Sequence, residues 1–320
     1  MSALLDTPLE LAALTLALAL STALWLVTAL LRCCAAARPR HVPTSVLITG
    51  ATSGLGAELA RLYAARHRGV ALALTGRNAD ALERTAAACR ELGATVRLLR
   101  ADVCARDELA RWIAQVDAEA PLDLVIANAG VTERTAGVAV GDLEGGARAC
   151  FAANVEGVFN TVFPALPGMR ARGRGQVCVV SSVASYAPFS VFDGYAASKA
   201  AVRVWAEGLR HRLHAEGVKV SCVTPGYIRG PMTAAFGGSL NLVGMVSQDY
   251  AAARVADGLA VDEPLIAFPH STFIASWMLS TLPPAVRDAI AASRLFAELR
   301  YANAGAPRPP APPAAHLLAT

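Results

Sequence analysis

Short apolar runs alternate with longer, mixed stretches along most of this chain. The apolar runs predict strands at seven places: Ser45–Thr49, Val70–Thr75, Thr95–Ala101, Leu122–Ala127, Gln176–Ser181, Val218–Thr224 and Leu265–Phe268. The stretches between them predict helices, for example at Leu55–His67, Asp80–Leu92, Asp107–Glu119 and Tyr195–Glu216. Strands that are apolar throughout and alternate with helices are typical of a parallel sheet covered on both faces. We therefore expect a doubly wound α/β fold with a parallel seven-stranded sheet.

A different pattern occupies the N-terminus. From Leu11 to Leu31 the chain carries no charged residue, and these 21 residues would form a helix about 30 Å long, enough to span a bilayer core. Acidic residues precede this segment, and the basic Arg32, Arg38 and Arg40 follow it. The positive-inside rule then predicts one transmembrane helix with the rest of the chain in the cytosol. In a eukaryotic cell we expect the endoplasmic reticulum membrane.

Two alternatives remain open for this segment. A secretory signal peptide would be cleaved near Ala35–Ala37, but it would carry a basic n-region and a shorter apolar run. A buried core helix would be shorter or amphipathic. We therefore expect three parts: a membrane anchor and linker (1–43), a folded domain (44–300) and a Pro- and Ala-rich disordered tail (301–320).

Composition narrows the classes of partner. Hydrophobic residues make up 54% of the chain, charged residues 17%, and the net charge is +4. The arginines are scattered and not interleaved with aromatic residues, so we expect no nucleic-acid partner. The seven cysteines form no CxxC pair and no His/Cys cluster with metal-ligand spacing. They indicate buried, reduced thiols and no bound metal.

A glycine-rich turn directly follows the first predicted strand. Thr49 leads into Gly50-Ala51-Thr52-Ser53-Gly54-Leu55-Gly56, and a helix is predicted to follow. Glycines let the backbone turn sharply and approach a pyrophosphate, and a helix N-terminus offers N–H groups to phosphates. Taken alone, the glycine-rich turn is equally well explained as a tight strand-to-helix loop. Its place between a strand and a helix favours a dinucleotide site in a Rossmann-like fold, with Gly50, Thr52, Ser53, Gly54, Leu55 and Gly56 as cofactor-binding candidates.

The ends of the next three strands carry further candidate cofactor contacts. A carboxylate after the second strand would bind the ribose hydroxyls of NAD, but Arg77 stands there and can pair with the 2′-phosphate of NADP. Arg77 is also explained as a surface residue at a helix start. Asp102 can accept from the adenine amine, and Asn128-Ala129-Gly130 forms a turn beside the cofactor. The sequence therefore favours NADP (NADPH) over NAD.

A hydroxyl, a phenol and an ammonium stand at a spacing that suits proton transfer. Tyr195 and Lys199 are four residues apart in a predicted helix and share a face, and Ser182 precedes Tyr195 by thirteen positions. The ordinary pKa of tyrosine is about 10, and a neighbouring ammonium would lower it. Of the 29 basic residues only Lys199 and Lys219 are lysines. An isolated Tyr-Lys pair at this spacing indicates an ordinary solvated face, but the glycine-rich turn favours a catalytic one.

Together these residues make the chain resemble the classical short-chain dehydrogenases/reductases. The match runs from Thr49 to about Met232 and rests on Thr49–Gly56, Asp102-Val103, Asn128-Ala129-Gly130, Asn154, Ser181-Ser182, Tyr195–Lys199 and Pro225-Gly226. The resemblance implies that Tyr195 is the general acid/base, that Ser182 hydrogen-bonds the reacting oxygen, and that Lys199 lowers the pKa of Tyr195 and holds the nicotinamide ribose. It also implies that Asn154 positions a water in a proton relay, although an isolated asparagine here would indicate a helix kink or cap.

Two positions depart from the family pattern. Ala127 stands where the family often has a further asparagine, a common variation. Gly230 stands where the family often has a threonine that contacts the nicotinamide amide, with Thr233 further on. We expect backbone groups near Ile228 to bind instead. Val103, Pro225 and Gly226 complete the expected cofactor site.

The implied chemistry is hydride transfer between a nicotinamide and a carbonyl or alcohol. Residues 227–248 should cover the substrate, and they include the apolar side chains of Met232, Phe236, Leu240, Leu242, Val243 and Met245. With the anchor, this favours a lipophilic substrate: a 3-keto lipid, a long-chain ketone, a steroid or a retinoid. A second apolar stretch, Phe273–Leu282, would either rest on the membrane surface or pack in the core, and we expect packing.

Two alternatives to this function are retained. One is an alcohol dehydrogenase working oxidatively on a steroid or retinoid. The other is a non-catalytic, membrane-tethered nucleotide-binding scaffold, which would have no need of Ser182, Tyr195 and Lys199 together. The family resemblance further implies a homodimer or homotetramer assembled through the helices around Asn154 and Tyr195.

Overall fold

The computed structural model describes residues 41–292, apart from Val140, 188–191 and 235–243, together with four positions nearer the N-terminus. Its strands form one seven-stranded sheet in the order β3-β2-β1-β4-β5-β6-β7. All neighbouring strands are parallel. The strands are β1 (Ser45–Thr49), β2 (Ala71–Gly76), β3 (Thr95–Arg100), β4 (Leu124–Ala127), β5 (Gly175–Val180), β6 (Val218–Pro225) and β7 (Leu265–Phe268).

The predicted fold class is confirmed, and most predicted boundaries are close. β1 and β7 have the predicted bounds, and the other strands differ by one or two residues at an end. The helices are α2 (Gly54–Arg66), α3 (Ala79–Glu91), α4 (Arg106–Glu119), α5 (Leu143–Phe151), α6 (Gly157–Val162), α7 (Leu166–Ala171), α8 (Asp193–Leu213), α9 (Pro231–Ala234), α10 (Gln248–Ala260), α11 (His270–Thr281) and α12 (Pro284–Ala292). Short helical turns lie at η2 (Ala152–Glu156), η3 (Val183–Ser185) and η4 (His214–Glu216).

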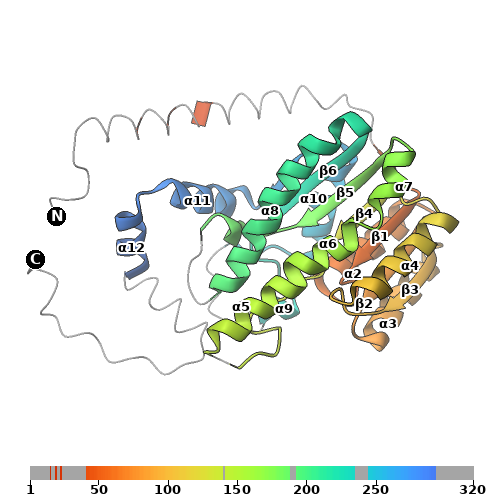
Figure 1. Ribbon diagram of the computed structural model, residues 1–320, viewed down its shortest axis with the longest axis horizontal. Coiled ribbons are helices and arrows are strands. Elements are labelled where there is room, and N and C mark those ends of the chain that lie inside the picture. The colour runs from red at the N-terminus through yellow and green to blue at the C-terminus, as the bar shows by residue number, and fades with distance from the viewer. Residues whose placement is uncertain are drawn as a thin grey trace, which may run out of the picture.

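Helices cover the sheet on both faces, which gives the protein two apolar layers. Successive residues of a strand point to opposite faces, so Val46 and Ile48 enter one layer and Leu47 enters the other. The first layer is closed by α2 and α10, and the second by α4, α6 and α8, which lie over one face of the sheet in Figure 1. Burial on both faces explains why the strands are apolar at nearly every position.

The winding of the sheet reverses between β1 and β4. From β1 the chain continues outward to β2 and β3, and then returns to place β4 on the other side of β1. In such sheets the carboxyl ends of the two strands diverge and leave a crevice between the loops that follow them. This topology therefore brings the glycine-rich turn after β1 and the turn after β4 to the same edge.

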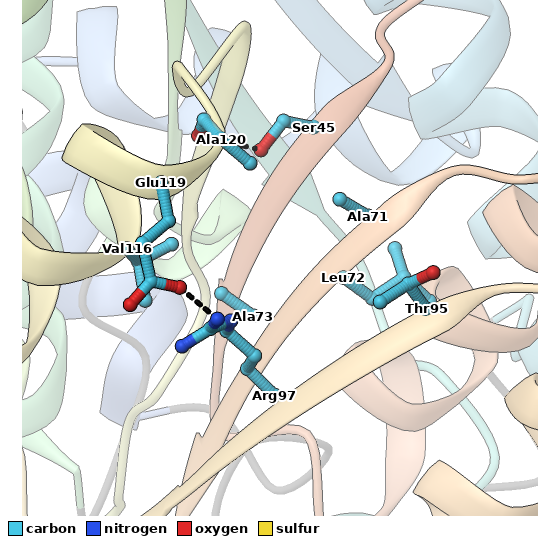
Figure 2. A pocket seen from close by; sticks show the side chains of 9 residues that line it. All are labelled: Ser45, Ala71, Leu72, Ala73, Thr95, Arg97, Val116, Glu119 and Ala120. Carbon is cyan, nitrogen blue, oxygen red and sulfur yellow. Dashed lines mark hydrogen bonds and ion pairs between the residues drawn. The ribbon is translucent and has the colours of Figure 1, made fainter.

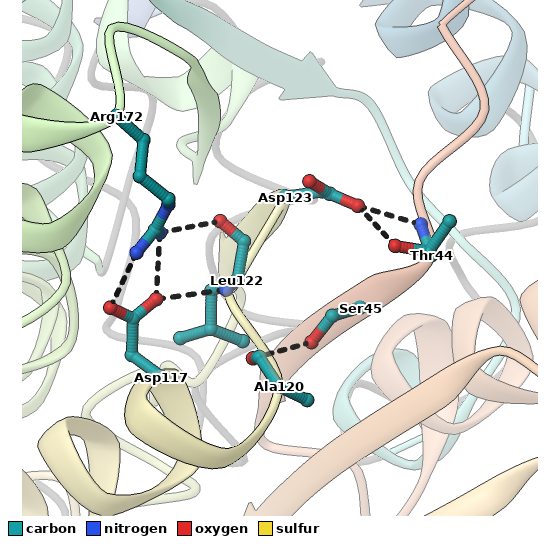
Figure 3. Close-up of polar contacts among 7 residues, drawn as sticks. All are labelled: Thr44, Ser45, Asp117, Ala120, Leu122, Asp123 and Arg172. Carbon is teal, nitrogen blue, oxygen red and sulfur yellow. Dashed lines mark hydrogen bonds and ion pairs between the residues drawn. The ribbon is translucent and has the colours of Figure 1, made fainter.

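The amino ends of the strands are held by polar contacts, shown in Figure 3. Asp123 accepts hydrogen bonds from the backbone N–H (2.9 Å) and hydroxyl (2.6 Å) of Thr44. Arg172 donates two 2.8 Å hydrogen bonds to the carboxylate of Asp117, which also accepts one from the N–H of Leu122. Burial acts to raise the pKa of Asp117, but the hydrogen bonds from Arg172 and Leu122 outweigh it and hold that pKa below its ordinary value.

Two expectations about apolar segments need correction. Cys89, Cys150, Cys178 and Cys222 are buried as predicted, but Cys104 is exposed because it lies in the surface turn between β3 and α4. Within α11, Phe273 is buried against Tyr186, whereas Ile274 (48% exposed) and Met278 (47%) face outward. The stretch therefore packs in the core along one face only.

The terminal segments lie largely outside the described residues. The predicted anchor, Leu11–Leu31, falls there almost entirely, and so does the predicted tail. Within the described part of the chain, no helix combines the length and the apolar character that crossing a membrane requires. The three-part division of the chain stays a prediction.

Replacing Asp117 by asparagine is expected to lower the free energy of unfolding by about 1–3 kcal/mol at neutral pH, the scale of hydrogen bonds to charged groups. Because the pKa of folded Asp117 is lowered, its contribution is present above its ordinary pKa and is lost as the pH falls through the lowered value. Urea unfolding at neutral and acidic pH measures both effects. The exposed Glu144, which pairs with Arg148, provides the control: Glu144→Gln should cost less than about 1 kcal/mol. Wild-type stability of the Asp117 variant at neutral pH would contradict the assignment.

Candidate active site

The glycine-rich turn after β1 is shaped by its glycines. Gly50 (φ +70°) and Gly54 (φ +58°) adopt the left-handed backbone conformation, which other residues rarely adopt. A Cβ atom at Gly50 would lie 2.8 Å from the Cα of Ala129, and one at Gly56 would clash with the carbonyl oxygen of Gly50. The turn thus packs directly on its neighbours at the start of α2. Side chains larger than hydrogen would push it away from β4.

A small hydrogen-bond network ties this turn to the end of β4. The hydroxyl of Thr49 accepts from the backbone N–H groups of Asn128 (3.1 Å) and Ala129 (3.2 Å). In return, the side-chain amide of Asn128 donates to the carbonyl oxygen of Thr49 at 2.9 Å. Asn128 therefore fixes the backbone of the glycine-rich turn, which is a structural role for a residue predicted to lie at the cofactor.

The residues around the turn fit the phosphates of a dinucleotide. Ser53 precedes α2 but makes no side-chain capping hydrogen bond, and the first turn of the helix holds no acidic residue. The positive end of the helix dipole therefore meets no negative side chain from the helix itself, a setting that favours an anionic ligand. At the end of β2, the hydroxyl oxygen of Thr75 is buried and has no hydrogen-bond partner among the described residues.

The loops after β2 and β3 lie together at the edge where the adenosine part would bind. Arg77 is 63% exposed at its side chain, and its guanidinium lies 3.7 Å from the carboxylate of Asp102. Asp102 also accepts from the backbone N–H of Cys104 at 2.9 Å, and Val103 is buried and accepts from the side chain of Asn160. Arg77 and Asp102, predicted separately from the sequence, are thus neighbours in space.

Ser182, Tyr195 and Lys199 come together at the carboxyl ends of β5 and β4. Lys199 is 3% exposed, and its ammonium donates to the carbonyl oxygen of Val180 at 2.8 Å. The same nitrogen lies 5.8 Å from the centre of the Tyr195 ring. Ser182 follows β5 by two residues at the start of η3, and its hydroxyl lies near enough to the phenol of Tyr195 to act on its pKa. The predicted shared face of Tyr195 and Lys199 is confirmed.

The electrostatics of this group differ from the expectation. Burial raises the pKa of Tyr195 to about 12, and the hydrogen bond with Ser182 acts in the opposite direction. Burial also lowers the pKa of Lys199 to about 8. The expected lowering of the pKa of Tyr195 is therefore not met in the protein by itself: the loss of hydration raises that pKa, and Lys199 is not among the groups that act to lower it.

Asn154 lies in the π-helical turn η2, between α5 and α6. Its side chain accepts from the N–H of Val131 (2.8 Å) and donates to the carbonyl oxygen of Val131 (2.9 Å) and to the hydroxyl of Ser198 (2.9 Å). It is fully buried. These contacts join the loop after β4 to α8, so the helix-shaping interpretation describes Asn154 well, and a role in a proton relay stays a prediction.

Gly130 is the point where these groups meet. A Cβ atom there would lie 2.9 Å from the carboxamide oxygen of Asn154 and 3.1 Å from the ammonium of Lys199. The absence of a side chain lets both polar groups approach the loop after β4. The nucleotide-binding edge and the Ser182–Tyr195–Lys199 group are therefore parts of one site.

Comparison with known proteins agrees with this geometry. Residues 44–239 match the short chain dehydrogenase family. The chain belongs to the short-chain dehydrogenases.

Several relatives resemble the chain over different lengths. An uncharacterized oxidoreductase of Myxococcus xanthus is 34% identical over 77% of this chain and 96% of its own. The 11-beta-hydroxysteroid dehydrogenase 1A of Arabidopsis thaliana is 36% identical over 64% of this chain, which spans only 58% of that relative's length. Human retinol dehydrogenase 8 is 34% identical, with 62% of each chain covered.

Solved structures of similar proteins contain both nicotinamide dinucleotides. A short-chain dehydrogenase of Sphingobium yanoikuyae in complex with NADPH has a TM-score of 0.65 and 27% identity, covering 78% of this chain and 96% of its own. A 3-oxoacyl-[acyl-carrier protein] reductase of Brucella melitensis with bound NAD has a TM-score of 0.61 and 28% identity, covering 72% and 91%. The similarity supports a nicotinamide dinucleotide and does not distinguish NADP from NAD.

In this short-chain dehydrogenase the loop after β6 is closed by a threonine. The hydroxyl of Thr233 accepts from the N–H of Gly230 at 3.0 Å and donates to the carbonyl oxygen of Ile228 at 2.7 Å. Pro225 ends β6, and the N–H of Gly226 donates to the carbonyl oxygen of Phe268 at 2.7 Å. Thr233 thus takes part in the turn at which the family often has a threonine. Of the apolar residues predicted to cover the substrate, Phe236, Leu240, Leu242 and Val243 lie outside the described residues.

Two surface cavities lie at the opposite end of the sheet, among the described residues. Figure 2 shows one lined by the amino ends of β1, β2 and β3 and by α4, with Arg97 and Glu119 paired across it. Its volume is about 200 Å³, below the ~300–1,000 Å³ of typical ligand pockets. A second cavity is lined by residues such as His41, Arg174 and Lys219. Neither contains a predicted site residue.

Two residues of the site were missed by the sequence analysis. Ser198 lies between Tyr195 and Asn154 and bonds both, through the carbonyl oxygen of Tyr195 (2.7 Å) and the side chain of Asn154. Glu133 accepts a hydrogen bond from the backbone N–H of Tyr195 at 2.8 Å. The position of Ser198 inside the Tyr195–Lys199 motif was a signal for the first. Glu133 lies 62 residues from its partner, and no local pattern marks it.

Replacing Gly130 by alanine is expected to lower kcat/KM on the order of tenfold to a hundredfold, because misplacing catalytic groups by about 1 Å has effects of this size. Asn154 cannot easily give way, since three hydrogen bonds hold its side chain. Steady-state kinetics measure the loss. Gly208→Ala is the matched control, because a Cβ atom there meets nothing within 4 Å and alanine favours the α8 helix. Equal activity of both variants would show that the close approach at Gly130 is unimportant.

Proposed function

We propose that this protein is a membrane-anchored, NADP-dependent oxidoreductase that reduces a carbonyl group of a lipophilic substrate. The observation that carries the proposal is the meeting of Ser182, Tyr195 and Lys199 beside the glycine-rich turn, with Gly130 between them and the β4 edge. A hydroxyl, a phenol and a buried ammonium next to a dinucleotide site can carry out proton transfer coupled to hydride transfer.

Each side chain has a role in this chemistry. The bound cofactor supplies or accepts the hydride. Ser182 and Tyr195 donate hydrogen bonds to the reacting oxygen and stabilise the negative charge that develops on it. Lys199 is buried and lies near the phenol, where it would bind the ribose hydroxyls. Tyr195 then donates its proton to the developing alkoxide.

The raised pKa of Tyr195 is consistent with the role of an acid in the reductive direction. With a pKa of about 12, the phenol keeps its proton at neutral pH and is ready to act as an acid. Oxidation of an alcohol needs the phenolate as a base, and burial opposes the charged form. A cofactor held in reduced form in the cytosol, NADPH, would act in the same direction.

The choice of NADP rests on the end of β2. The strand ends at Gly76, and the next residue is Arg77, whose side chain is 63% exposed. A second guanidinium approaches, since Arg100 donates to the carbonyl oxygen of Arg77 at 3.4 Å. Two cationic groups at this edge would bind a 2′-phosphate, although Asp102 partly neutralises Arg77.

We expect NADPH to be used with a higher kcat/KM than NADH. Changing Arg77 to Ala should raise the KM for NADPH at least about tenfold, the loss of one charged hydrogen bond, and leave the KM for NADH nearly unchanged. Initial rates of the purified protein with each cofactor measure both. Arg90→Ala, which removes an exposed arginine of α3 paired with Glu83, is the control. A clear preference of the wild-type protein for NADH would refute the proposed role of Arg77.

The lipophilic substrate is proposed from the surroundings of the site. The loop after β6 is held by a bridge between Ile228 and Val246, and the sequence between them is rich in apolar residues. Two relatives carry names that specify hydroxysteroids and retinol. The uncharged segment from Leu11 to Leu31 supports attachment to a membrane, where such substrates concentrate, with the catalytic domain in the cytosol.

The full chain, reconstituted into phospholipid vesicles, is expected to stay with the vesicles after an alkaline carbonate wash and to consume NADPH with a lipophilic ketone. A panel of a steroid ketone, retinal, a 3-keto lipid and a short water-soluble ketone, read as loss of NADPH absorbance, tests both parts. Tyr195→Phe is the control, because it keeps the ring and removes the acidic proton. Turnover by that variant would refute the assigned acid, and preference for the soluble ketone would refute the substrate class. Tight NADPH binding without turnover on any substrate would favour the scaffold alternative.

Assembly into a homodimer or homotetramer is supported by exposed apolar side chains on neighbouring helices. Phe151 (42% exposed), Phe163 (50%) and Val204 (58%) are large apolar side chains on the outer sides of the α5, α6 and α8 region. Phe163 packs against Trp205 with ring centres 5.7 Å apart. A patch of this kind suits contact with a second copy, and sedimentation analysis of the purified protein reports its oligomeric state.

A further inference from the structure

One carboxylate reaches the catalytic helix from outside all the family motifs. Glu133 lies three residues past Gly130, in the loop after β4, and its Oε1 accepts a hydrogen bond from the backbone N–H of Tyr195 at 2.8 Å. Tyr195 is the third residue of α8, so this N–H is one of those that a helix leaves unpaired at its start. Phe192, at the N-cap position, makes no side-chain capping hydrogen bond. The side chain of Asp193 accepts from the N–H of Gly194, and Glu133, 62 residues away in sequence, supplies the acceptor for the N–H of Tyr195.

The carboxylate sits in a space that two glycines leave open. A Cβ atom at Gly146 of α5 would lie 2.8 Å from the Cγ of Glu133. One at Gly194 of α8 would lie 3.0 Å from its Oε1 and 2.6 Å from the Cα of Ala147. A side chain at either position would expel Glu133 from between the two helices. The close packing of α5 and α8 at these two glycines therefore sets the position of the carboxylate.

The second carboxylate oxygen of Glu133 has an unusual environment. Oε2 of Glu133 is buried and forms no hydrogen bond of standard geometry with the described residues. A charge with an unbonded buried oxygen is costly, and such a group is seldom found without a purpose. Its other partners are the positive end of the α8 dipole and the thiol of Cys150, whose pKa is raised by burial and by the nearby carboxylate.

We propose that Glu133 is a positioning residue that fixes the first turn of α8, and with it the phenol of Tyr195, against the loop that follows β4. The proposal rests on the proposed function in taking Tyr195 as the acid. The same loop carries Gly130, beside Lys199, and Val131, which binds Asn154. Glu133 therefore extends to the phenol the contacts that already hold the ammonium and the carboxamide in place.

The charge of Glu133 also acts on the phenol. Tyr195 faces Lys199 on its own helix, Ser182 from the β5 end, Cys150 from α5, Tyr227 from the loop after β6, and Glu133. Burial is the largest cause of its raised pKa, and the negative charge of Glu133 acts in the same direction. Removing that charge while keeping the hydrogen bond should therefore lower the pKa of Tyr195.

Two substitutions separate the hydrogen bond from the charge. Glu133→Gln keeps an oxygen that accepts from the N–H of Tyr195, whereas Glu133→Ala removes it. Hydrogen exchange of the segment that contains Tyr195, read by mass spectrometry, needs no substrate. We expect the segment to exchange at least about tenfold faster in the alanine variant and at the wild-type rate in the glutamine variant.

Kinetics and titration complete the test. The alanine variant should lose kcat on the order of tenfold or more with the KM for NADPH nearly unchanged, and glutamine should restore most of it. In the glutamine variant, the ultraviolet titration of Tyr195, taken as the difference from the Tyr195→Phe protein, should move to lower pH. Asp193→Asn is the matched control: it removes an exposed carboxylate from the same helical turn, one that bonds only the N–H of Gly194 among the described residues.

The outcomes are distinct. Unchanged exchange and kcat in the alanine variant would overturn the proposal, and so would equal losses in the alanine and glutamine variants, which would indicate a merely structural residue. If the alanine variant does not fold, an unshifted titration of Tyr195 in the glutamine variant overturns it. Turnover by Tyr195→Phe would instead refute the proposed function, whatever the Glu133 variants do.

Discussion

The whole site depends on the close approach of α8 to the loop that follows β4. Gly130 has no side chain, so the ammonium of Lys199 and the carboxamide of Asn154 both pack against it. Because β4 is hydrogen-bonded to β1 and Asn128 binds the turn after β1, this approach also fixes the distance between the phenol and the glycine-rich turn. One backbone contact thus sets the spacing between the group that would donate a proton and the place where a dinucleotide would lie.

Polar groups inside this region are satisfied mainly by backbone. Lys199 donates to Val180, Asn154 is bonded to both backbone groups of Val131, and Ser181 donates to the carbonyl oxygen of Lys199 at 2.8 Å. A buried ammonium with a neutral acceptor keeps its charge less readily than one in water, which is why the pKa of Lys199 falls to about 8. The same loss of water raises the pKa of Tyr195. The exclusion of water therefore disfavours the charged form of both side chains before any ligand adds its own charge.

The two ends of the sheet differ in how their polar groups are hydrogen-bonded. At the amino ends, Asp117, Arg172, Asp123 and Thr44 form hydrogen bonds and an ion pair that join the starts of strands to α4 and α7. These side chains form hydrogen bonds with one another or with nearby backbone groups. At the carboxyl ends, the hydroxyls of Thr75, Ser185 and Thr224 are buried without partners among the described residues. Unbonded buried groups also occur elsewhere, for example Oε1 of Gln176 at the amino end of β5, but these three hydroxyls lie at the end where parallel sheets bind ligands.

The sequence by itself determined the strands, the sheet class and the residues of the motifs, because strand burial and short motifs are local properties of the chain. The i, i+4 spacing was enough to place Tyr195 and Lys199 on one face. Only the tertiary structure decided how water is excluded around them, and it reversed the expected shift in the pKa of Tyr195. It alone also revealed Glu133 as the acceptor for the N–H of Tyr195, the pairing of Arg77 with Asp102, and the exposure of Cys104. Burial and contacts between distant residues depend on how whole elements pack, and no window of sequence contains both partners.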